Sequence, residues 1–242
     1  RGSLGRVFMV RRRHGLSTQL WDVRSMWHFD AALNRDIWAD DAAHPIDFLH
    51  WLLGVPETVT AEISSLHDPA APNDNGIAVF RYADGLLAEV ACSFTTLAAE
   101  NTVEVVTEKG SIVQSYGDAP SCNVPRPPGA VGQKWYTAET KDWTPSAIPS
   151  PSGHGARIAG LAGPIADFLA GRRPPIATAE EGRTSLRMVL ATYVASREGR
   201  RVRIDDPAVA RVLRRSPCRR RPARRSAHST STSRSAASTR PS

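Results

Sequence analysis

Residues 77–94 read IAVFRYADGLLAEVACSF, which is two apolar runs joined by the turn Ala83-Asp84-Gly85. Both runs are rich in residues that favour strands, and aspartate followed by glycine suits the backbone of a tight reversal. The stretch therefore predicts an antiparallel β-hairpin. Antiparallel sheets commonly bury one face and expose the other, so the hairpin also predicts a sheet that must be covered on one side.

Strand-like runs continue on both sides of this hairpin. They lie at residues 5–13, 58–66, 102–107 and 111–116, the last two flanking a second turn, Glu108-Lys109-Gly110. Consecutive strands joined by tight turns predict an antiparallel meander. Residues 117–153 are rich in proline, glycine and serine and predict a long loop, carrying Trp135, Tyr136 and Trp143, that serves as a lid or an interface arm.

Two helical patterns follow the loop. Residues 157–170 and 179–198 carry apolar side chains at helical spacing and end at Gly171 and Gly199, and residues 201–204 predict an edge strand. Strands in a block with helices at both ends indicate an α+β fold. We therefore expect an open, mostly antiparallel β-sheet covered by helices on one face.

The charge divides the chain into two parts. The net charge is +7, but the segment from residue 207 to the end holds ten arginines and no acidic residue. Removing these ten from the 31 basic residues leaves 21 against 24 acidic ones, so the body is slightly acidic. We predict a folded domain over residues 1–206 and a disordered Arg/Ser-rich tail over residues 207–242. The tail lacks interleaved aromatic side chains, which disfavours a nucleic-acid partner.

The remaining composition narrows the class of protein. Three widely spaced cysteines form no CxxC pair, which favours reduced thiols and a cytoplasmic protein and gives no metal site. No apolar run approaches ~18 residues, so no membrane partner is expected. The chain begins without a methionine or a signal-peptide pattern, and it is interpreted as a fragment of a longer protein.

Residues 40–54, DDAAHPIDFLHWLLG, place an imidazole and several carboxylates at the head of an apolar helix. Asp40 and His44 are one turn apart and share a face if the helix already includes Asp40. The helix dipole and a neighbouring carboxylate act on His44 in opposite directions, and a histidine balanced this way is suited to exchange protons. Ile46, Leu49 and Leu53 form the opposite, core-facing stripe, and Gly54 is a stop signal.

Two other interpretations of this cluster stay open from the residues alone. Asp40 and His44 are also explained by a capped helix start with a satisfied histidine. A metal site would need Asp40, His44, Asp47 and His50 together, but His50 points to a different face of the helix. Among the tryptophans, Trp21, Trp27 and Trp51 are interpreted as core or pocket wall.

The order of several motifs resembles a known family. The chain reads Trp27-His28-Phe29-Asp30, then Asp40-x-x-x-His44-x-x-Asp47, then Trp51-Leu52-Leu53-Gly54, followed by residues 80–85, Lys109-Gly110, residues 167–169, residues 181–186 and residues 195–202. This order resembles the C-terminal domain of the glucose–fructose oxidoreductase, inositol dehydrogenase and rhizopine-catabolism (Gfo/Idh/MocA) proteins, over about residues 2–206.

The resemblance implies a function and its residues. The full-length protein would use NAD or NADP to oxidise or reduce a sugar, cyclitol or related polyol, and it would be a homo-oligomer assembled through the sheet face. His44 corresponds to the family's proton shuttle and Asp40 to its orienting carboxylate. We also expect Asp41, Asp47 and Trp27 to contact the substrate, with a structural partner as the other interpretation of Asp47.

The family's nucleotide-binding half is not recognisable in this sequence. No G-x-G-x-x-G follows a strand near the start, and Glu108-Lys109-Gly110 is a hairpin turn rather than the family's Glu-Lys-Pro motif. We therefore expect no complete cofactor site in this chain and no activity from it alone. The alternative is a non-catalytic dimerisation or sugar-binding scaffold of the same fold.

Overall fold

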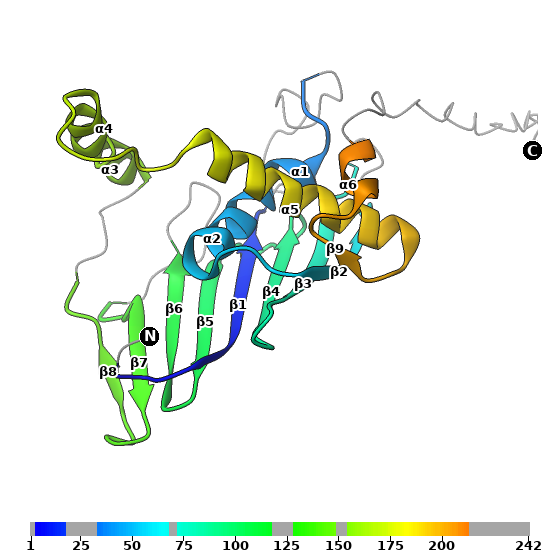
Figure 1. Ribbon diagram of the computed structural model, residues 1–242. Helices are drawn as coiled ribbons and strands as arrows, with labels where there is room; N and C mark the ends of the chain where they lie inside the picture. The colour runs from blue at the N-terminus through cyan, green and yellow to red at the C-terminus, as the bar shows by residue number, and fades with distance from the viewer. Residues whose placement is uncertain (1–2, 18–32, 68–71, 118–127, 149–153, 213–242) are drawn as a thin grey trace, which may run out of the picture.

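Figure 1 shows the computed structural model of the chain, which describes residues 3–17, 33–67, 72–117, 128–148 and 154–212. One open sheet runs in the order β8-β7-β6-β5-β1-β4-β3-β2-β9. The strands are β1 Val7–Gly15, β2 Thr58–Ser64, β3 Asn75–Arg81, β4 Leu87–Ser93, β5 Asn101–Thr107, β6 Gly110–Gly117, β7 Gln133–Thr137, β8 Trp143–Pro145 and β9 Val202–Arg203. The helices are α1 Ile37–Asp41, α2 Ala43–Leu53, α3 His154–Ala159, α4 Ala162–Leu169, α5 Ala179–Glu198 and α6 Pro207–Val212. The predicted α+β fold with a mostly antiparallel sheet is confirmed.

The strand order corrects the predicted meander. β1 is inserted between β4 and β5, parallel to β4 and antiparallel to β5. Val10 of β1 pairs with Ala88 and Val105 and is fully buried. Side-chain alternation tells which face a strand buries but not which strands lie beside it, and only roughly two-thirds of consecutive strands are neighbours. The meander therefore holds from β2 to β4 and from β5 to β8, and it fails between β4 and β5.

Helices α1, α2, α5 and α6 cover one face of the sheet (Figure 1). Phe80 of β3 and Val90 of β4 point into that face and are fully buried. Ile46 and Leu49 of α2 meet them from the helix side, as their spacing predicted, and α5 adds Val194. Burying one such side chain contributes about 1.5–3 kcal/mol, so this helix–sheet layer is the core that holds α2 in place.

Trp38 of α1 is the largest fully buried side chain of this layer. Its indole Nε1 donates a hydrogen bond to Thr192 Oγ1 of α5 at 2.9 Å. The ring lies against β3 at Gly76, where an added Cβ would come within 2.4 Å of the Trp38 Cζ3 atom. Glycine is therefore required beneath the tryptophan, because the sheet backbone and the ring occupy the space that a side chain would need.

The longest helix, α5, has the ends that the sequence predicted. Thr178 caps its start, with Glu181 N–H donating to Thr178 Oγ1 at 3.2 Å and Thr178 N–H donating to Glu181 Oε2 at 2.7 Å. The Thr178 N–H, and the Thr178 hydroxyl that donates to the same carboxylate oxygen at 3.0 Å, lower the pKa of Glu181. Gly199 ends the helix in the left-handed conformation, with φ of 61°. No helix in the described part of the chain combines the length and the apolar composition that a membrane crossing requires.

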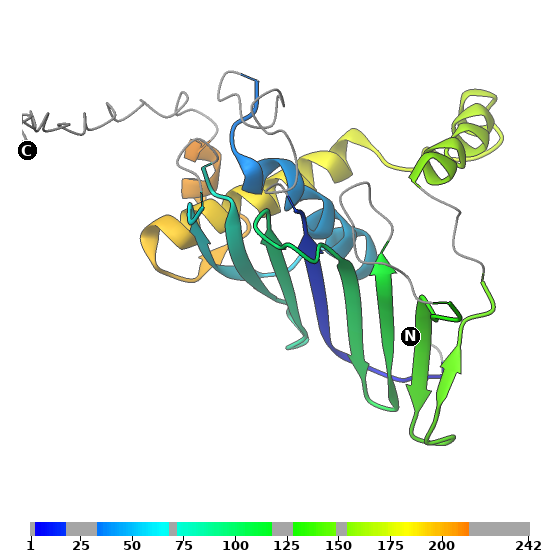
Figure 2. The same ribbon diagram turned by 180° about the vertical axis from the view of Figure 1, so that it is seen from behind.

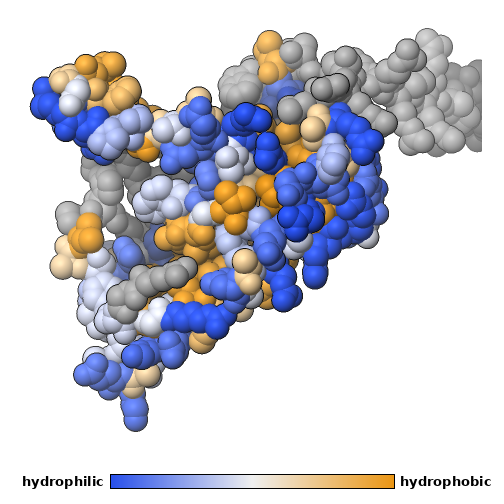
Figure 3. Space-filling model, in the orientation of Figure 1, coloured by the Kyte–Doolittle hydropathy of each residue, from blue (hydrophilic) through white to orange (hydrophobic). Residues whose placement is uncertain are grey.

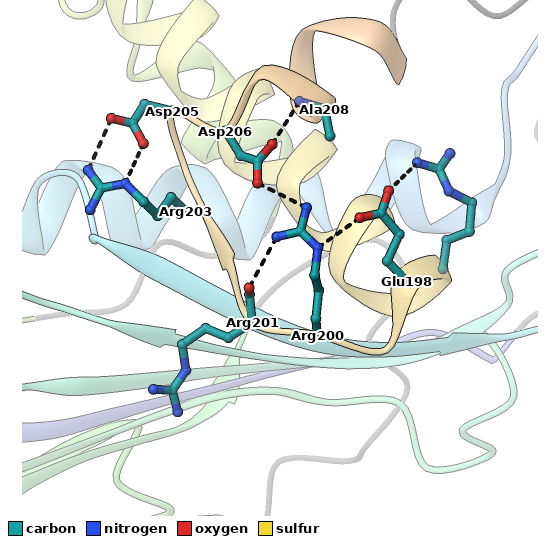
Figure 4. A network of polar contacts seen from close by, with 8 residues as sticks. Glu198, Arg200, Arg201, Arg203, Asp205, Asp206 and Ala208 are labelled. Atoms are coloured by element: carbon teal, nitrogen blue, oxygen red, sulfur yellow. Dashed lines mark hydrogen bonds and ion pairs between the residues drawn. The ribbon is translucent and has the colours of Figure 1, made fainter.

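Ion pairs fix the turn that follows α5 (Figure 4). The Arg200 guanidinium binds Glu198 Oε2 at 2.8 Å and Asp206 Oδ2 at 2.9 Å. The other oxygen of Asp206 accepts the Ala208 N–H at 2.8 Å and so starts α6. Both sets of bonds lower the pKa of Asp206, the Ala208 bond most.

Helix α6 corrects the predicted start of the disordered tail. Residues 207–212 are helical, and Ala208, Val209 and Val212 are buried against the core. The arginine-rich composition of the whole tail obscured these three apolar residues, which share one helix face. Residues 213–242 lie outside the described residues.

Two further predictions are corrected between residues 117 and 170. The predicted loop over residues 117–153 contains β7 and β8, whose Tyr136 and Trp143 rings meet edge to face at 5.7 Å. The single helix predicted over residues 157–170 is two helices, α3 and α4, which break around Gly160 because glycine is a poor helix former. Residues 133–137 alternate polar and apolar side chains as a strand does, but the many prolines around them favoured a loop prediction.

Helices α3 and α4 project from the body of the molecule (Figure 1). No side chain of α4 is buried. An apolar stripe runs along the two helices and is visible as orange atoms at the upper left of Figure 3; it consists of Ile158, Leu161, Ile165, Phe168 and Leu169, all at least 43% exposed. The spacing of this stripe is that of one helix face.

Figure 2 shows the opposite face of the sheet, which no helix of the described residues covers. Ile77 and Val79 of β3 and Leu87 of β4 lie on this face and are 37–53% exposed. Arg11 of β1 bridges Glu89 and Glu104 on the neighbouring strands at 3.5 and 3.2 Å. The face is therefore a mixture of apolar side chains and solvent-screened ion pairs.

The packing of Trp38 on Gly76 gives a stability prediction. Gly76→Ala is expected to destabilise the chain by about 1–3 kcal/mol, because the new methyl overlaps the indole. Gly182→Ala is the matched control: its Cβ would meet nothing within 4 Å, and alanine in a helix is expected to add about 0.5–1 kcal/mol. Urea unfolding followed by circular dichroism measures both. Equal stability of the two variants would contradict the packing described above.

Candidate functional site

The predicted cluster lies where the ends of β1 and β4 meet under α2. Because these strands are parallel, their carboxyl ends share one edge of the sheet. His14 of β1 is the register partner of Cys92 of β4, and both side chains face the helix-covered side and are buried. The parallel pair thus brings a histidine and a thiol from distant parts of the sequence beneath the head of α2.

Asp36 determines where α1 begins. Its buried carboxylate accepts the Ala39 N–H at 2.8 Å, the Asn73 amide at 2.8 Å and the Tyr193 hydroxyl. Burial raises the pKa of Tyr193, and the Asp36 charge raises it further, so the hydroxyl stays a donor. α1 ends at Asp41 and α2 begins at Ala43. The predicted pair Asp40 and His44 is therefore placed on two short helices rather than on one.

Two imidazoles and one carboxylate form the centre of the cluster. His14 Nε2 lies 3.3 Å from Asp41 Oδ1, and the side chains of both residues are less than 15% exposed. The rings of His14 and His44 are stacked, with their centroids 6.1 Å apart and an interplanar angle of 30°. His44 itself is exposed. The site thus has a buried Asp–His pair on one side and a solvent-accessible histidine on the other.

The second carboxylate of α1, Asp40, is half-buried and accepts a hydrogen bond from Asn34 Nδ2 at 3.3 Å. Both carboxylates act on Cys92 beneath them. Burial raises the pKa of the Cys92 thiol well above its ordinary value, and the charges of Asp41 and Asp40 raise it further. Cys92 is therefore a protonated, apolar wall of the site rather than a nucleophile.

A second contact between β1 and α2 lies next to the histidines. The Arg12 guanidinium carbon is 5.5 Å from the centroid of the Phe48 ring, and Arg12 Nη1 donates to the Thr102 carbonyl at 3.2 Å. Arg12 and His14 are two residues apart on β1 and share its inner face, and His44 and Phe48 are four residues apart on α2 and share one helix face. The Arg12–Phe48 contact therefore lies beside the His14–His44 contact.

Asp47 binds α5 rather than the group formed by His14, Asp41 and His44. Its Oδ1 accepts the Ser185 hydroxyl at 2.5 Å, and the same hydroxyl lies 3.0 Å from His50 Nδ1. These bonds clamp α2 to α5. Trp51, interpreted from the sequence as core or pocket wall, is instead 76% exposed, because its place on the helix face away from Ile46 points it to solvent. Trp21 and Trp27 lie outside the described residues.

Among the described residues, the histidine, cysteine and acidic side chains form no metal centre, and the backbone forms no phosphate-binding turn for a nucleotide. No group of three histidine, cysteine or acidic side chains there could hold a metal ion. Side chains cap the starts of α1 and α5, at Asp36 and Thr178, whereas α2 and α4 have no side-chain cap. Among the described residues no glycine-rich turn leads from a strand into a helix. Dinucleotide pyrophosphates bind at such turns, so the residues present do not fit a nicotinamide cofactor by themselves.

His14 is the main residue that sequence reasoning missed. The predicted strand ended at residue 13, whereas β1 extends to Gly15. Extending the period-two alternation from buried Val10 would have placed Arg12 and His14 on the same inward face. The parallel pairing with β4, which brings His14 to Cys92, had no signal in the sequence.

Comparison with known proteins identifies the sequence family of the first half. Residues 1–113 match the family model of the GFO/IDH/MocA C-terminal domain. The matched region contains His14, Asp40, Asp41, His44 and Asp47. No curated protein matches the sequence.

Three solved structures with a similar fold are dehydrogenases or oxidoreductases. Levoglucosan dehydrogenase in complex with NADH and L-sorbose is 17% identical, covers 85% of this chain and 60% of its own, and has a TM-score of 0.68. Aldose-aldose oxidoreductase from Caulobacter crescentus complexed with glycerol is 25% identical, with coverages of 84% and 57% and a TM-score of 0.64. The WlbA dehydrogenase from Bordetella pertussis in complex with NADH and UDP-GlcNAcA is 21% identical, with coverages of 84% and 56% and a TM-score of 0.59. The chain therefore spans 56–60% of the length of these proteins.

The environment of Cys92 gives a prediction for the site. Because the raised pKa keeps the thiol protonated at neutral pH, iodoacetamide is expected to leave Cys92 unmodified in the folded chain. In urea the same residue should react fully, which serves as the control. Peptide mass spectrometry distinguishes Cys92 from the other cysteines. Rapid labelling of Cys92 in the native chain would contradict a closed floor beneath Asp40 and Asp41.

Proposed function

With residues 1–113 identified as a GFO/IDH/MocA C-terminal domain, we propose that this chain supplies the sugar-binding and proton-transfer side of an NAD(P)-dependent oxidoreductase. The observation that carries the proposal is the group formed by Asp41, His14 and His44, in which an exposed imidazole is stacked on a buried Asp–His pair. Such a group has little value for packing, because the exposed ring buries little apolar surface. It has the composition that proton exchange with a substrate hydroxyl needs.

The proposed roles follow from exposure. His44 is accessible and lies near the start of α2, so it is the group that takes or gives the proton of the reacting hydroxyl or carbonyl. Asp40 and Asp41 are carboxylates at the same place, and carboxylate oxygens accept hydrogen bonds from sugar hydroxyls. Asp47 lies one turn further along α2 and is exposed, which suits an outer substrate contact. Trp27, outside the described residues, is proposed as a wall of the sugar site.

A nicotinamide cofactor would supply the hydride chemistry of such a reaction. NADH is bound in the levoglucosan dehydrogenase and WlbA structures, which supports NAD or NADP as the cofactor of the full-length protein. The roles that we propose for the described residues are to bind the sugar and to move its proton. The free thiol of Cys92 suits a reducing compartment, and we place the protein in the cytoplasm.

The substrate class is proposed as a sugar, cyclitol or related polyol. L-sorbose, glycerol and UDP-GlcNAcA are the compounds bound in the three similar structures, and each carries several hydroxyl groups. The carboxylates of Asp40 and Asp41 and the exposed imidazole of His44 can bind neighbouring hydroxyls while one of them is oxidised. This match supports the class of substrate and leaves the individual sugar to be measured.

The proposal predicts a specific loss on changing His44. In an enzyme in which this chain is joined to a nucleotide-binding domain, His44→Gln is expected to lower kcat by about 10²–10⁴-fold, the usual contribution of a general acid or base. The melting temperature should stay unchanged because the His44 side chain is exposed. NAD(P)H absorbance with a panel of sugars and cyclitols measures the first, and circular dichroism measures the second.

Two controls complete this test. Asp205→Asn, on an exposed turn beyond β9, should keep full activity, because Asp205 binds only Arg203 among its described side-chain partners. The chain by itself should reduce no NAD(P) with any polyol. Wild-type turnover by His44→Gln, or turnover by the isolated chain, would contradict the proposed division of roles.

We further propose that the open sheet face joins copies of the chain into a homo-oligomer. Ile77, Val79 and Leu87 are exposed on this face without a covering helix among the described residues. Contiguous apolar side chains on a flat surface are typical of protein interfaces. The same observation favours the alternative that the domain acts as a dimerisation scaffold, in which case the oligomer would form and His44→Gln would have no effect on turnover.

The oligomer predicts an effect of charge on this face. Val79→Glu combined with Leu87→Lys is expected to shift the chain to the monomer, since an interface core excludes unpaired charge. Sedimentation velocity measures the shift. Ile165→Glu, on the projecting α4, is the matched control, as Ile165 is similarly exposed but lies away from the sheet face. Identical sedimentation of the double variant and the wild-type chain would argue against an interface here.

A further inference from the structure

His14 is a buried titratable residue that takes no direct part in the proposed proton transfer. It stands on the central strand β1, between Cys92 of β4 and Asn101 of β5, and is 5% exposed. Two ladders of backbone hydrogen bonds therefore fix its position. A histidine is an unusual choice for such a place, because a buried polar side chain is unfavourable unless its nitrogens are paired.

We propose that His14 is a positioning residue that holds the imidazole of His44 in one orientation for proton transfer. The proposal rests on the proposed role of His44 and adds the group that aligns it. His14 is only 5% exposed, so we assign it no contact with the sugar and expect it to act through His44.

The first step of the argument is the bond to Asp41. His14 Nε2 lies 3.3 Å from Asp41 Oδ1, and the geometry assigns the proton to Nε2, as the donor to this carboxylate. Nδ1 is buried and has no hydrogen-bond partner among the described residues. The bond to Asp41 therefore holds the His14 ring in one orientation, with Nε2 toward the carboxylate.

The second step is the stack. The His44 ring lies over the His14 ring at 6.1 Å between centroids and 30° between planes, within the range of offset aromatic stacking. An exposed histidine without such a neighbour samples several rotamers. The stack restricts these while leaving the edge of the His44 ring, with its nitrogens, open to a substrate hydroxyl. Holding a reacting group in one geometry raises the rate of its reaction.

The charged groups around His14 agree with this role. Asp41 of α1 bonds to the His14 ring, and His44 of α2 is stacked on it. Asp40 of α1 acts on the neighbouring Cys92, and Arg12 precedes His14 on the same face of β1. Asp41 is the carboxylate bonded to the His14 ring, whereas Asp40 accepts a bond from Asn34. Asp41 thus anchors the ring that in turn orients His44.

The experiment observes the His44 ring directly in the full chain. Histidine-labelled protein gives one imidazole Cε1–H signal per residue, and His44→Gln assigns the signal of His44. His14→Gln keeps a donor for Asp41 but removes the aromatic ring, and it should move the His44 signal toward that of an exposed histidine. His14→Phe keeps a ring and should retain most of the original shift. The exposed His67 provides a matched control, since His67→Gln should leave the His44 signal in place.

Folding is monitored in the same samples. The indole N–H signal of Trp38 depends on its buried bond to Thr192 and should persist in every folded variant. If His14→Gln does not fold, Asp41→Asn replaces it, with Asp40→Asn as its matched control. Asp41→Asn should broaden or split the signals of both His14 and His44, and Asp40→Asn should not. An unchanged His44 signal in His14→Gln, or in Asp41→Asn where that variant replaces it, would overturn the positioning role.

An activity measurement separates this inference from the proposed function. In the enzyme joined to its nucleotide-binding domain, His14→Gln should lower kcat about tenfold with little change in KM, because misalignment affects the reacting geometry more than sugar binding. If His44→Gln abolishes turnover while His14→Gln leaves the His44 signal unchanged, the function stands and the positioning role fails. If the signal moves but His44→Gln keeps full turnover, positioning stands and the proposed function fails.

Discussion

The constraint on which the rest of the structure depends is the insertion of β1 between β4 and β5. A central strand must satisfy hydrogen bonds on both edges and bury side chains on its covered face. Because β1 and β4 are parallel, the chain must return to the end of the sheet at which β1 began before β4 can start. The connection between the two strands includes α1, α2, β2 and β3. The helices that carry Asp41 and His44 are therefore part of the connection that the pairing of β1 demands.

Polar side chains, of which Asp36 is buried, then fix where that connection lies. The Asp36 carboxylate binds α1, the Asn73 side chain and α5 at once, and Trp38 fills the space above Gly76. On the other side of α2, Asp47 and His50 share the hydroxyl of Ser185. A buried acceptor left without its donors costs about 1–3 kcal/mol, so these bonds specify position more than they add stability. The head of α2 is held from both sides before any substrate arrives.

Sequence reasoning reached the local structure and part of the site. Hairpin turns, the limits of α5, the core stripe of Ile46 and Leu49, and the stop at Gly54 all follow from short-range chemistry that one segment contains. The insertion of β1, the helix of residues 207–212 and the contact between His14 and Asp41 depend on which segments meet. Side-chain periodicity predicts which face of a helix or strand is buried, but it does not predict which other element packs against that face. His44 could be found because its helix motif is contiguous, whereas His14 could not, because its partners lie 27 or more residues away in the chain.

The two faces of the sheet separate the two roles that we propose for this chain. The covered face carries the carboxylates and imidazoles at one edge, where α2 leaves His44 accessible. The open face carries exposed apolar side chains on β3 and β4 and ion pairs on β1. Successive residues of a strand alternate between these faces, so Arg11 and Arg13 belong to one surface and Arg12 and His14 to the other. A single strand can therefore serve both the proposed assembly and the proposed proton transfer, and a change on one face leaves the other in register.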